Sequence, residues 1–319
     1  MISGKRVLFV NDTSEECHWG SFATSSRIKL EILKAGPSKL EILSTFDIAA
    51  ASNLPKDSSE LELSFANFAA NNKTICDKIK NSDFVVINGE GTIHGFSPRA
   101  LTLLYIMHIA KKQYGRRVFV INHSCFLEQD SPRVRQFYRA CYECCDYVAV
   151  RERASFDTLE GLGVKSTLAF DSMPLTIREM SGKRGPIFKK GRRTICLSGG
   201  VNFRKSKTRM IAFWLKLLFP KHDFIFLLGG LNPENPNDKF DETIALEIGK
   251  RFRNLRIIRA ESLEEWLGCI KSAEILVTGR FHYAVTRMAF GGPMVAFESN
   301  TPKTSEVLET ASCKVQWLR

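Results

Sequence analysis

The chain has 319 residues, 44% hydrophobic and 25% charged, which is typical of a globular protein and excludes a disordered or fibrous one. This length allows two domains of ordinary size. The formal net charge of +12 favours an anionic partner, such as nucleic acid, a membrane surface, or acidic small molecules and glycans.

The N-terminal segment and the cysteines both favour a cytoplasmic location. The sequence MISGKRVLFVND has only a four-residue apolar run, too short for the hydrophobic region of a signal peptide. No eighteen apolar residues run together, so no transmembrane helix is expected. The nine cysteines are odd in number and indicate free thiols in a reducing compartment. The basic surface also allows peripheral association with the inner face of the membrane.

The first half of the chain alternates between apolar runs typical of strands and stretches typical of helices. The expected strands lie at 5–11, 39–45, 83–89, 116–122, 146–150 and 166–173. The expected helices lie at 27–34, 59–81, 97–115, 134–144 and 151–163. Strands separated by helices of this length form right-handed crossovers and therefore a parallel sheet. Cys141, Cys144 and Cys145 resemble half of a zinc site, but no second pair accompanies them, so we expect buried helix cysteines and no metal site.

A basic segment at 181–193, SGKRGPIFKKGRR, separates the two halves. It contains Gly and Pro and little apolar periodicity, so we interpret it as an interdomain linker. A nucleic-acid-binding arm is the alternative. No zinc-finger, RNP or basic-zipper pattern accompanies it, so we expect no nucleic-acid partner.

The alternation restarts after this segment. The expected strands lie at 193–200, 223–230, 255–260, 273–279, 293–299 and 313–318. The fold class is therefore α/β, with two Rossmann-like domains whose parallel sheets face each other across a cleft. We place the N-terminal domain at 1–175, the linker at 176–192 and the C-terminal domain at 193–319. This architecture suits an enzyme whose two substrates bind to different domains.

Polar residues and glycines follow the expected strands, at the sheet edge where open α/β sheets bind ligands. In the first half these residues are Asn11, His18, Glu90, His94, Asn122, His123 and Arg151. In the second half they are Gly199, Gly200, Asn202, Arg204, Arg280 and His282, followed by Lys303 and Glu306 in a later helix. A single histidine at such a place is more often structural than catalytic. The repetition along one sheet edge is what favours a site.

The stretch VTGRFHYAVTRMAFGGPMVAFES, from Val277 to Ser299, is the most informative. Its beginning continues a buried strand, so Arg280 and His282 fall in the first turn of a helix. Helix N-termini favour anions. An arginine opposes the helix dipole there, which favours a ligand-binding role for Arg280 and likewise for Arg151. Histidine is the residue type suited to proton transfer near neutral pH.

Four stretches together resemble the polysaccharide pyruvyl transferase family. They are NGEGTIHG, VRERAS with the following LEGLGV and FDSM, CLSGGVNFR, and above all TGRFHYAVTRMAFGGPMVAFESNTPKTSEVLE. The last has the family's order of Arg, apolar residue, His, helix, Gly-x-Pro, strand and lysine-bearing helix. The resemblance covers most of the chain in outline and implies a two-domain enzyme of glycosyltransferase-B shape. Two loops differ: the family's all-glycine turn is Gly-Glu-Gly here, and HWGSFAT replaces the early Asn-Gly-Asp loop.

The resemblance implies a transferase that moves the enolpyruvyl group of phosphoenolpyruvate onto sugar hydroxyls of a polysaccharide or glycan precursor, forming a pyruvate ketal. Phosphoenolpyruvate is then a co-substrate, no resident cofactor is implied, and the need for a divalent ion stays open. His282 and Arg280 are the implied catalytic residues. The implied donor-binding residues are Arg151, Gly199, Gly200, Asn202, Arg204, Lys303 and Glu306. The implied acceptor-binding residues are Asn11, His18, Glu90, His94, Asn122 and His123.

Two alternatives remain open at this point. A glycosyltransferase of the same shape would use a nucleotide-activated sugar, with Lys303 and Glu306 holding the nucleotide. A non-catalytic anion-binding or nucleic-acid-binding protein could also use this scaffold, although Arg280 and His282 argue against a decayed site. The sequence does not indicate the oligomeric state, the acceptor sugar or the polymer, which we expect to be a cell-surface glycan.

Overall fold

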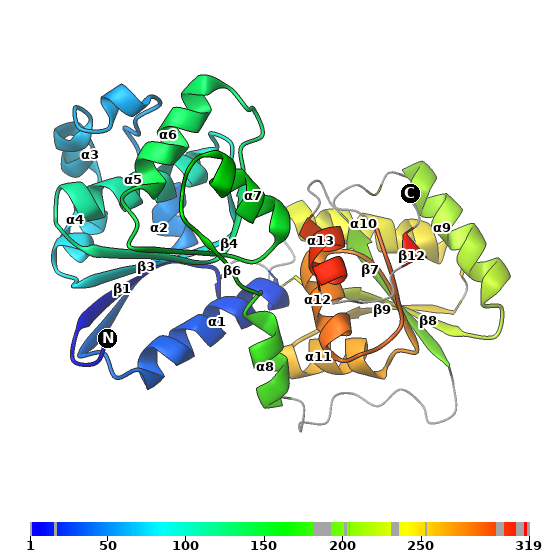
Figure 1. Ribbon diagram of the computed structural model, residues 1–319. Helices are drawn as coiled ribbons and strands as arrows, with labels where there is room; N and C mark the ends of the chain where they lie inside the picture. Colours follow the sequence, from blue (N-terminus) through cyan, green and yellow to red (C-terminus); the bar gives the residue numbers. More distant parts are fainter. Residues whose placement is uncertain are drawn as a thin grey trace. The chain divides into compact units, whose positions relative to one another are not determined.

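A computed structural model describes residues 2–15, 18–180, 193–200, 203, 205–230, 236–252, 254–297, 303–310 and 316–317. The chain forms two compact units, each built on a six-stranded parallel sheet (Figure 1). Unit 1 comprises Met1–Glu15 and Ile28–Asp171, and unit 2 comprises Glu16–Arg27 and Ser172–Arg319. The predicted α/β fold with two parallel sheets is thereby confirmed.

The composition of unit 2 differs from that of the expected C-terminal domain, because residues 16–27 group with it. The sequence HWGSFAT, read as a loop, forms the start of helix α1 (Trp19–Lys34). Its first turn is capped by His18, whose Nδ1 accepts a hydrogen bond from the Gly20 N–H at 3.0 Å. Of the expected linker, residues 176–180 lie in helix α8 (Met173–Met180), and residues 181–192 lie outside the described residues.

Sheet 1 has the strand order β2-β1-β3-β4-β5-β6. Its strands are β1 (Arg6–Asp12), β2 (Lys39–Ser44), β3 (Phe84–His94), β4 (Arg117–Phe126), β5 (Tyr147–Val150) and β6 (Thr167–Leu168). Its helices are α2 (Thr45–Ala49), η1 (Ser58–Glu60), α3 (Phe65–Asn71), α4 (Lys73–Lys80), α5 (Pro98–Lys112), α6 (Pro132–Tyr142) and α7 (Arg153–Gly161). The expected helix at 59–81 is interrupted at Asn72, whose side chain donates to the Phe68 and Ser52 carbonyls instead.

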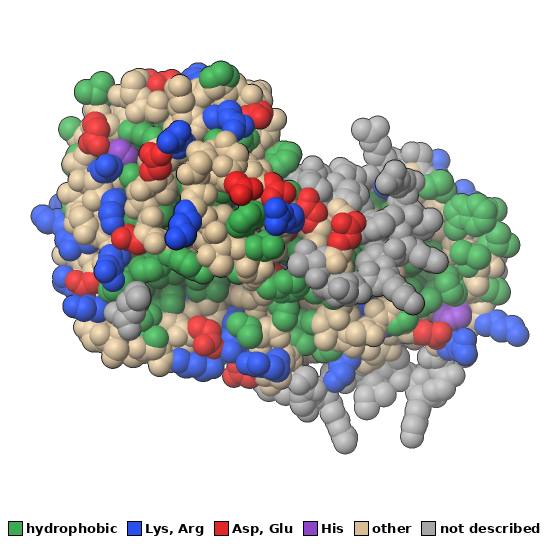
Figure 2. Space-filling model, viewed as in Figure 1, with side chains coloured by type: hydrophobic (Ala, Val, Ile, Leu, Met, Phe, Trp, Pro, Cys, Tyr) green, Lys and Arg blue, Asp and Glu red, His purple; other side chains and the backbone are tan. Residues whose placement is uncertain are grey.

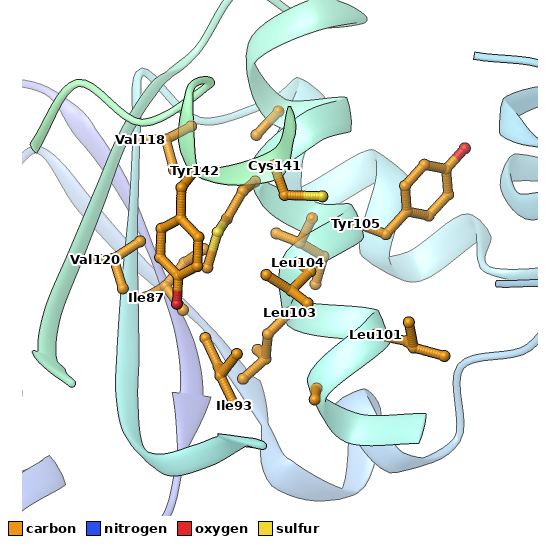
Figure 3. Packing of buried hydrophobic residues seen from close by; sticks show 14 of the residues in the cluster. Ile87, Ile93, Leu101, Leu103, Leu104, Tyr105, Val118, Val120, Cys141 and Tyr142 are labelled. Carbon is orange, nitrogen blue, oxygen red and sulfur yellow. The ribbon is translucent and has the colours of Figure 1, made fainter. Parts of the chain in front are cut away.

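Helices cover both faces of sheet 1. On one face, Ile87, Val118 and Val120 of the strands lie opposite Leu103 and Leu104 of α5 (Figure 3). On the other face, the C-terminal half of α1 packs on β1 and β3. The buried residues of this second cluster are Val7, Phe9, Ile28, Ile32, Phe84 and Val86. Because both faces are buried, the strands read as continuous apolar runs, as parallel strands do.

Sheet 2 has the strand order β12-β11-β10-β7-β8-β9. Its strands are β7 (Thr194–Gly200), β8 (Asp223–Leu228), β9 (Leu255–Arg259), β10 (Ile275–Gly279), β11 (Met294–Ala296) and β12 (Gln316–Trp317). Its remaining helices are α9 (Lys205–Leu218), α10 (Pro236–Gly249), α11 (Leu263–Ser272), α12 (Phe281–Ala289) and α13 (Lys303–Thr310). The order reverses between β7 and β10, and a doubly wound sheet binds ligands at the carboxyl ends of the strands at such a point.

We predict that Leu104→Ala lowers the free energy of unfolding by about 2–5 kcal/mol, because Leu104 is fully buried between α5 and sheet 1. Urea denaturation followed by circular dichroism measures this change. The control is Leu63→Ala, at a side chain 83% exposed, which should change stability by no more than about 0.5 kcal/mol. Equal effects of the two substitutions would contradict this description of the core.

Candidate functional site

The reversal point of sheet 2 is a close contact between two glycines. Gly200 ends β7 and pairs in register with Gly279, which ends β10. A Cβ on Gly279 would lie 2.8 Å from the Gly200 Cα, so a side chain cannot fit there. The hydroxyls of Ser198 and Thr278, one on each strand, hydrogen-bond to each other at 2.5 Å. The two strand ends are therefore fixed side by side.

Arg280 follows β10 directly and is the N-cap residue of α12. Its backbone N–H donates to the Thr278 Oγ1 at 3.0 Å. Its guanidinium donates two hydrogen bonds to the Asp241 carboxylate of α10 in a bidentate arrangement, from Nε to Oδ2 at 3.1 Å and from Nη2 to Oδ1 at 2.5 Å. This is the planar geometry that arginine offers to an anion, and here an internal carboxylate occupies it.

Asp241 is a residue of this site that the sequence analysis missed. Its carboxylate lies directly over Gly199, where a Cβ would be only 1.9 Å from Oδ1. Burial raises the pKa of Asp241, and the neighbouring Arg280 opposes that rise. No local pattern in α10 marks this aspartate. Only the folding of α10 beside the end of β7 brings it to Arg280.

The imidazoles of His18 and His282 lie together in unit 2, with ring centroids 6.2 Å apart. His282 packs against the first turn of α1, where a Cβ on Gly20 would approach the His282 Cβ to 2.4 Å. The rings of Tyr283 and Trp266 lie 5.6 Å and 6.0 Å from the His18 ring. Glycine at position 20 therefore permits the approach of α1 to α12 that brings the two histidines together.

His18 is held in the neutral form. Burial lowers its pKa well below the ordinary value, and the positive charges of His282 and Arg280 act in the same direction. Because its Nδ1 accepts from Gly20, the proton sits on Nε2, which has no hydrogen-bond partner among the described residues. His18, expected in the acceptor-binding domain, is thus a helix cap beside His282 in unit 2.

Other predicted donor residues lie at or near the same edge. Gly199 and Gly200 form the end of β7, and their lack of side chains admits Asp241 and the end of β10. Lys303 begins α13 and holds its Nζ 5.8 Å from the centroid of the Phe281 ring, in the first turn of α12. Glu306 lies one turn further along α13. Asn202 and Arg204 lie outside the described residues.

In unit 1, the expected loop NGEGTIHG is instead part of β3, which pairs with β4 as far as His94 and Phe126. Asn11 donates to the Asn88 carbonyl at 2.6 Å, and Asn122 donates to the Asn88 Oδ1 at 3.0 Å. Both asparagines are buried with left-handed φ angles of 65° and 51°. The amides thus join the ends of β1, β3 and β4, and acceptor binding by these residues stays a prediction.

Glu90 and His123 are register partners on β3 and β4. Glu90 is buried and has a φ of 39°, a backbone conformation unfavourable for a glutamate. His123 contacts the Tyr142 hydroxyl through Nε2, and its Nδ1 lies against Gly89. Burial, with Arg151 and His94 nearby, lowers the pKa of His123 to about 3. His123 is therefore neutral at physiological pH.

Arg151 lies in a buried network rather than on a surface. Its side chain is 2% exposed, with Nη1 2.7 Å from the Asp171 Oδ2. Its Nε donates to the Ser124 hydroxyl at 2.8 Å, and Ser124 donates to Glu152. A guanidinium so enclosed positions the end of β5, so we leave Arg151 out of the donor site proposed below.

The described residues include no group of three or more His, Cys, Asp or Glu arranged to hold a metal ion. Cys141 and Cys144 are buried and Cys145 is partly buried, all three as free thiols. Burial raises the pKa of each. Within the part of the chain that the structure describes, no helix is long and apolar enough to cross a membrane.

Two Rossmann-type sheets with polar residues at their carboxyl edges define the class of two-domain α/β enzymes that includes glycosyltransferase-B proteins. A model of the polysaccharide pyruvyl transferase family matches residues 19–301. The chain therefore belongs to the polysaccharide pyruvyl transferase family, and it is a transferase. No curated protein matches the sequence significantly.

Solved structures with the same fold include UDP-N-acetylglucosamine 2-epimerases. The enzyme from Neisseria meningitidis bound to UDP-GlcNAc is 12% identical, with a TM-score of 0.57, over 96% of this chain and 90% of that one. The enzyme from Methanocaldococcus jannaschii is 13% identical, with a TM-score of 0.58, over 98% of this chain and 88% of that one. At such identities the likeness shows the fold alone.

We predict that acid destabilises the protein in part through His123. A histidine with a folded pKa near 3 and an ordinary value of 6.5 favours folding above pH 6.5 and loses that contribution as the pH falls toward 3. Each pH unit in this window should cost about 1.4 kcal/mol. His123→Gln should flatten this pH dependence of urea unfolding. Tyr142→Phe, which removes only the hydroxyl partner, should keep it, and an unchanged slope in His123→Gln would contradict the assignment.

Proposed function

We propose that this transferase moves the pyruvyl group of phosphoenolpyruvate onto a glycan hydroxyl pair, forming a ketal, and that unit 2 binds the donor. The observation that carries the proposal is the pairing of Arg280 and His282 on the first turn of α12, at the reversal point of sheet 2. Membership of the pyruvyl transferase family supports the choice of the transferred group.

The charges at this edge suit a small anion. The first turn of α12 presents the positive end of the helix dipole, and Lys303 adds a cation over Phe281. Asp241 occupies Nε and Nη2 of Arg280, so within the described residues the Nη1 hydrogens are left for a donor oxygen. A carboxylate or phosphate would thus meet an arginine already fixed in orientation.

His282 is the proposed general acid. It gives its proton to the methylene carbon of the enol, and positive charge develops at the adjacent carbon that carries the phosphate oxygen. A sugar hydroxyl attacks that carbon and releases its proton. A second hydroxyl then displaces phosphate, which closes the ketal. Because His18 is held neutral, no second charged imidazole opposes a proton on His282.

A direct test adds phosphoenolpyruvate or UDP-GlcNAc separately to the protein and measures thermal stability. The proposal expects stabilisation by phosphoenolpyruvate, because a ligand that binds only the folded state raises the melting temperature. Stabilisation by the nucleotide sugar alone would instead favour a glycosyltransferase. Release of phosphate with a candidate glycan, together with a product one pyruvyl group heavier, would identify the reaction.

Arg280→Lys should raise the dissociation constant for phosphoenolpyruvate about tenfold, since lysine keeps the charge but loses the planar fork. Isothermal calorimetry measures the constant, and Arg256→Lys, at an exposed arginine of β9, is the control. Asp241→Asn removes a negative charge beside the donor while keeping Arg280, so donor binding should not weaken in that variant if it folds. An unchanged constant in Arg280→Lys would remove Arg280 from the donor site.

His282→Gln should lower turnover about a hundredfold or more while phosphoenolpyruvate binding and folding stay near normal. His108→Gln serves as the control, because His108 of α5 pairs with Glu62, outside that helix, and has a structural role. That control should lose stability, with activity following the folded fraction. Normal turnover of a well-folded His282→Gln protein would refute the acid role.

A further inference from the structure

Helix α9 has one buried face and one exposed apolar face. The inner face, made of Thr208, Ile211, Ala212 and Leu215, is buried on sheet 2. The opposite face forms an outer stripe that consists of Met210, Phe213, Trp214, Leu217 and Leu218. Their exposed fractions are 50%, 60%, 51%, 60% and 63%. The spacing of the outer stripe follows one side of a helix, so the five side chains lie together.

Figure 2 shows hydrophobic side chains gathered over the outer side of α9, at the right-hand end of the view. Single exposed hydrophobic residues are ordinary on protein surfaces. Five large ones on adjacent turns of one helix are not, and such patches mark sites of binding to proteins or membranes. The outer stripe includes an aromatic pair, Phe213 and Trp214, whose ring centroids lie 5.6 Å apart.

The charged residues of α9 and of the segment directly after it are all basic. Residues 205–222 contain five Lys or Arg and no Asp or Glu. Among them, Arg209 and Lys216 lie on α9 beside the stripe, and exposed Lys221 follows the helix. Glu247 of α10 approaches from the neighbouring helix, 3.9 Å from the Arg209 Nε and 2.5 Å from the Lys250 Nζ. Among the described residues, Glu247 forms ion pairs with Arg209 and Lys250, and it forms none with Lys216 or Lys221.

A cavity of about 500 Å³ opens at the end of α9. Three cationic residues line it, Lys216, Lys250 and Arg251, together with Phe219 and Phe252. Aromatic walls with cations suit a phosphate group attached to an apolar body. Lys216 belongs both to α9 and to the cavity wall, so the cationic cavity adjoins the outer stripe.

We propose that α9 docks unit 2 on a membrane rich in anionic phospholipid. The outer stripe would lie at the boundary between headgroups and acyl chains, with Lys216, Lys221 and the cationic cavity on lipid phosphates. A helix with Trp, Phe and Leu on one face and only basic residues beside them has the composition of interfacial helices. This inference is independent of the proposed reaction and gives the membrane association expected from the net charge a defined surface.

The test is co-sedimentation of the full chain with vesicles of equal parts phosphatidylglycerol and phosphatidylcholine, and with phosphatidylcholine alone. Wild type should bind the anionic vesicles, less so at high salt, and bind the neutral ones weakly. Phe213→Ser with Leu217→Ser should reduce anionic binding about tenfold or more, because both apolar contacts are lost. Lys216→Gln with Lys221→Gln should reduce anionic binding only.

The matched control is Phe46→Ser with Leu63→Ser, which replaces side chains that are 57% and 83% exposed in unit 1. It should bind vesicles as wild type does, and melting temperatures should show that all variants fold. Wild-type binding by the Phe213→Ser, Leu217→Ser protein would overturn the proposal. The proposal would also be overturned if the wild type formed a dimer and bound no vesicles, while the variant was a monomer. A second copy of the chain would then cover the stripe.

Discussion

The pair between Arg280 and Asp241 determines what the carboxyl edge of sheet 2 can attract. The Arg280 and Asp241 side chains are only 15% and 9% exposed. Removal of one member of a buried pair typically costs about 3–5 kcal/mol, because the other charge is left uncompensated. The pair depends in turn on two absent side chains, at Gly199, which admits the carboxylate, and at Gly200, which admits β10. Backbone packing therefore sets the electrostatics of the site, and the net attraction for an anion comes from the helix end and from donors that Asp241 leaves open.

The residues at the point where the strand order reverses differ between the two sheets. In sheet 1 the strand order reverses between β1 and β3, and there Asn11 and Asn88 hydrogen-bond across the gap. In sheet 2 the corresponding place holds an ion pair, two hydroxyls and two histidines nearby. Neutral amides do not titrate, whereas the carboxylate of the ion pair in sheet 2 does.

Much of the fold could be predicted because buried parallel strands read as apolar runs. Arg280 and His282 could be placed at the start of a helix because both follow one such run. NGEGTIHG was misread because its glycines indicate a turn, while β3 continues its pairing with β4 to His94, with a shift of register between Glu90 and Ile93. Asp241 carried no signal, since its partner lies 39 positions away. HWGSFAT was read as a loop, because the capping of α1 by His18 depends on the imidazole rather than on a usual capping residue.

Unit 2 is assembled from two distant pieces of the chain, residues 16–27 and those from Ser172 onward. During synthesis the piece that contains His18 and Gly20 emerges first, yet Ala260 and His282, which it contacts, are among the last residues made. On the ribosome, the start of α1 therefore emerges well before the residues of unit 2 that it contacts. A fragment that begins at Ser172 would lack His18, which caps α1, and Gly20, against which His282 of α12 packs. A complete unit 2 therefore needs both stretches of the chain.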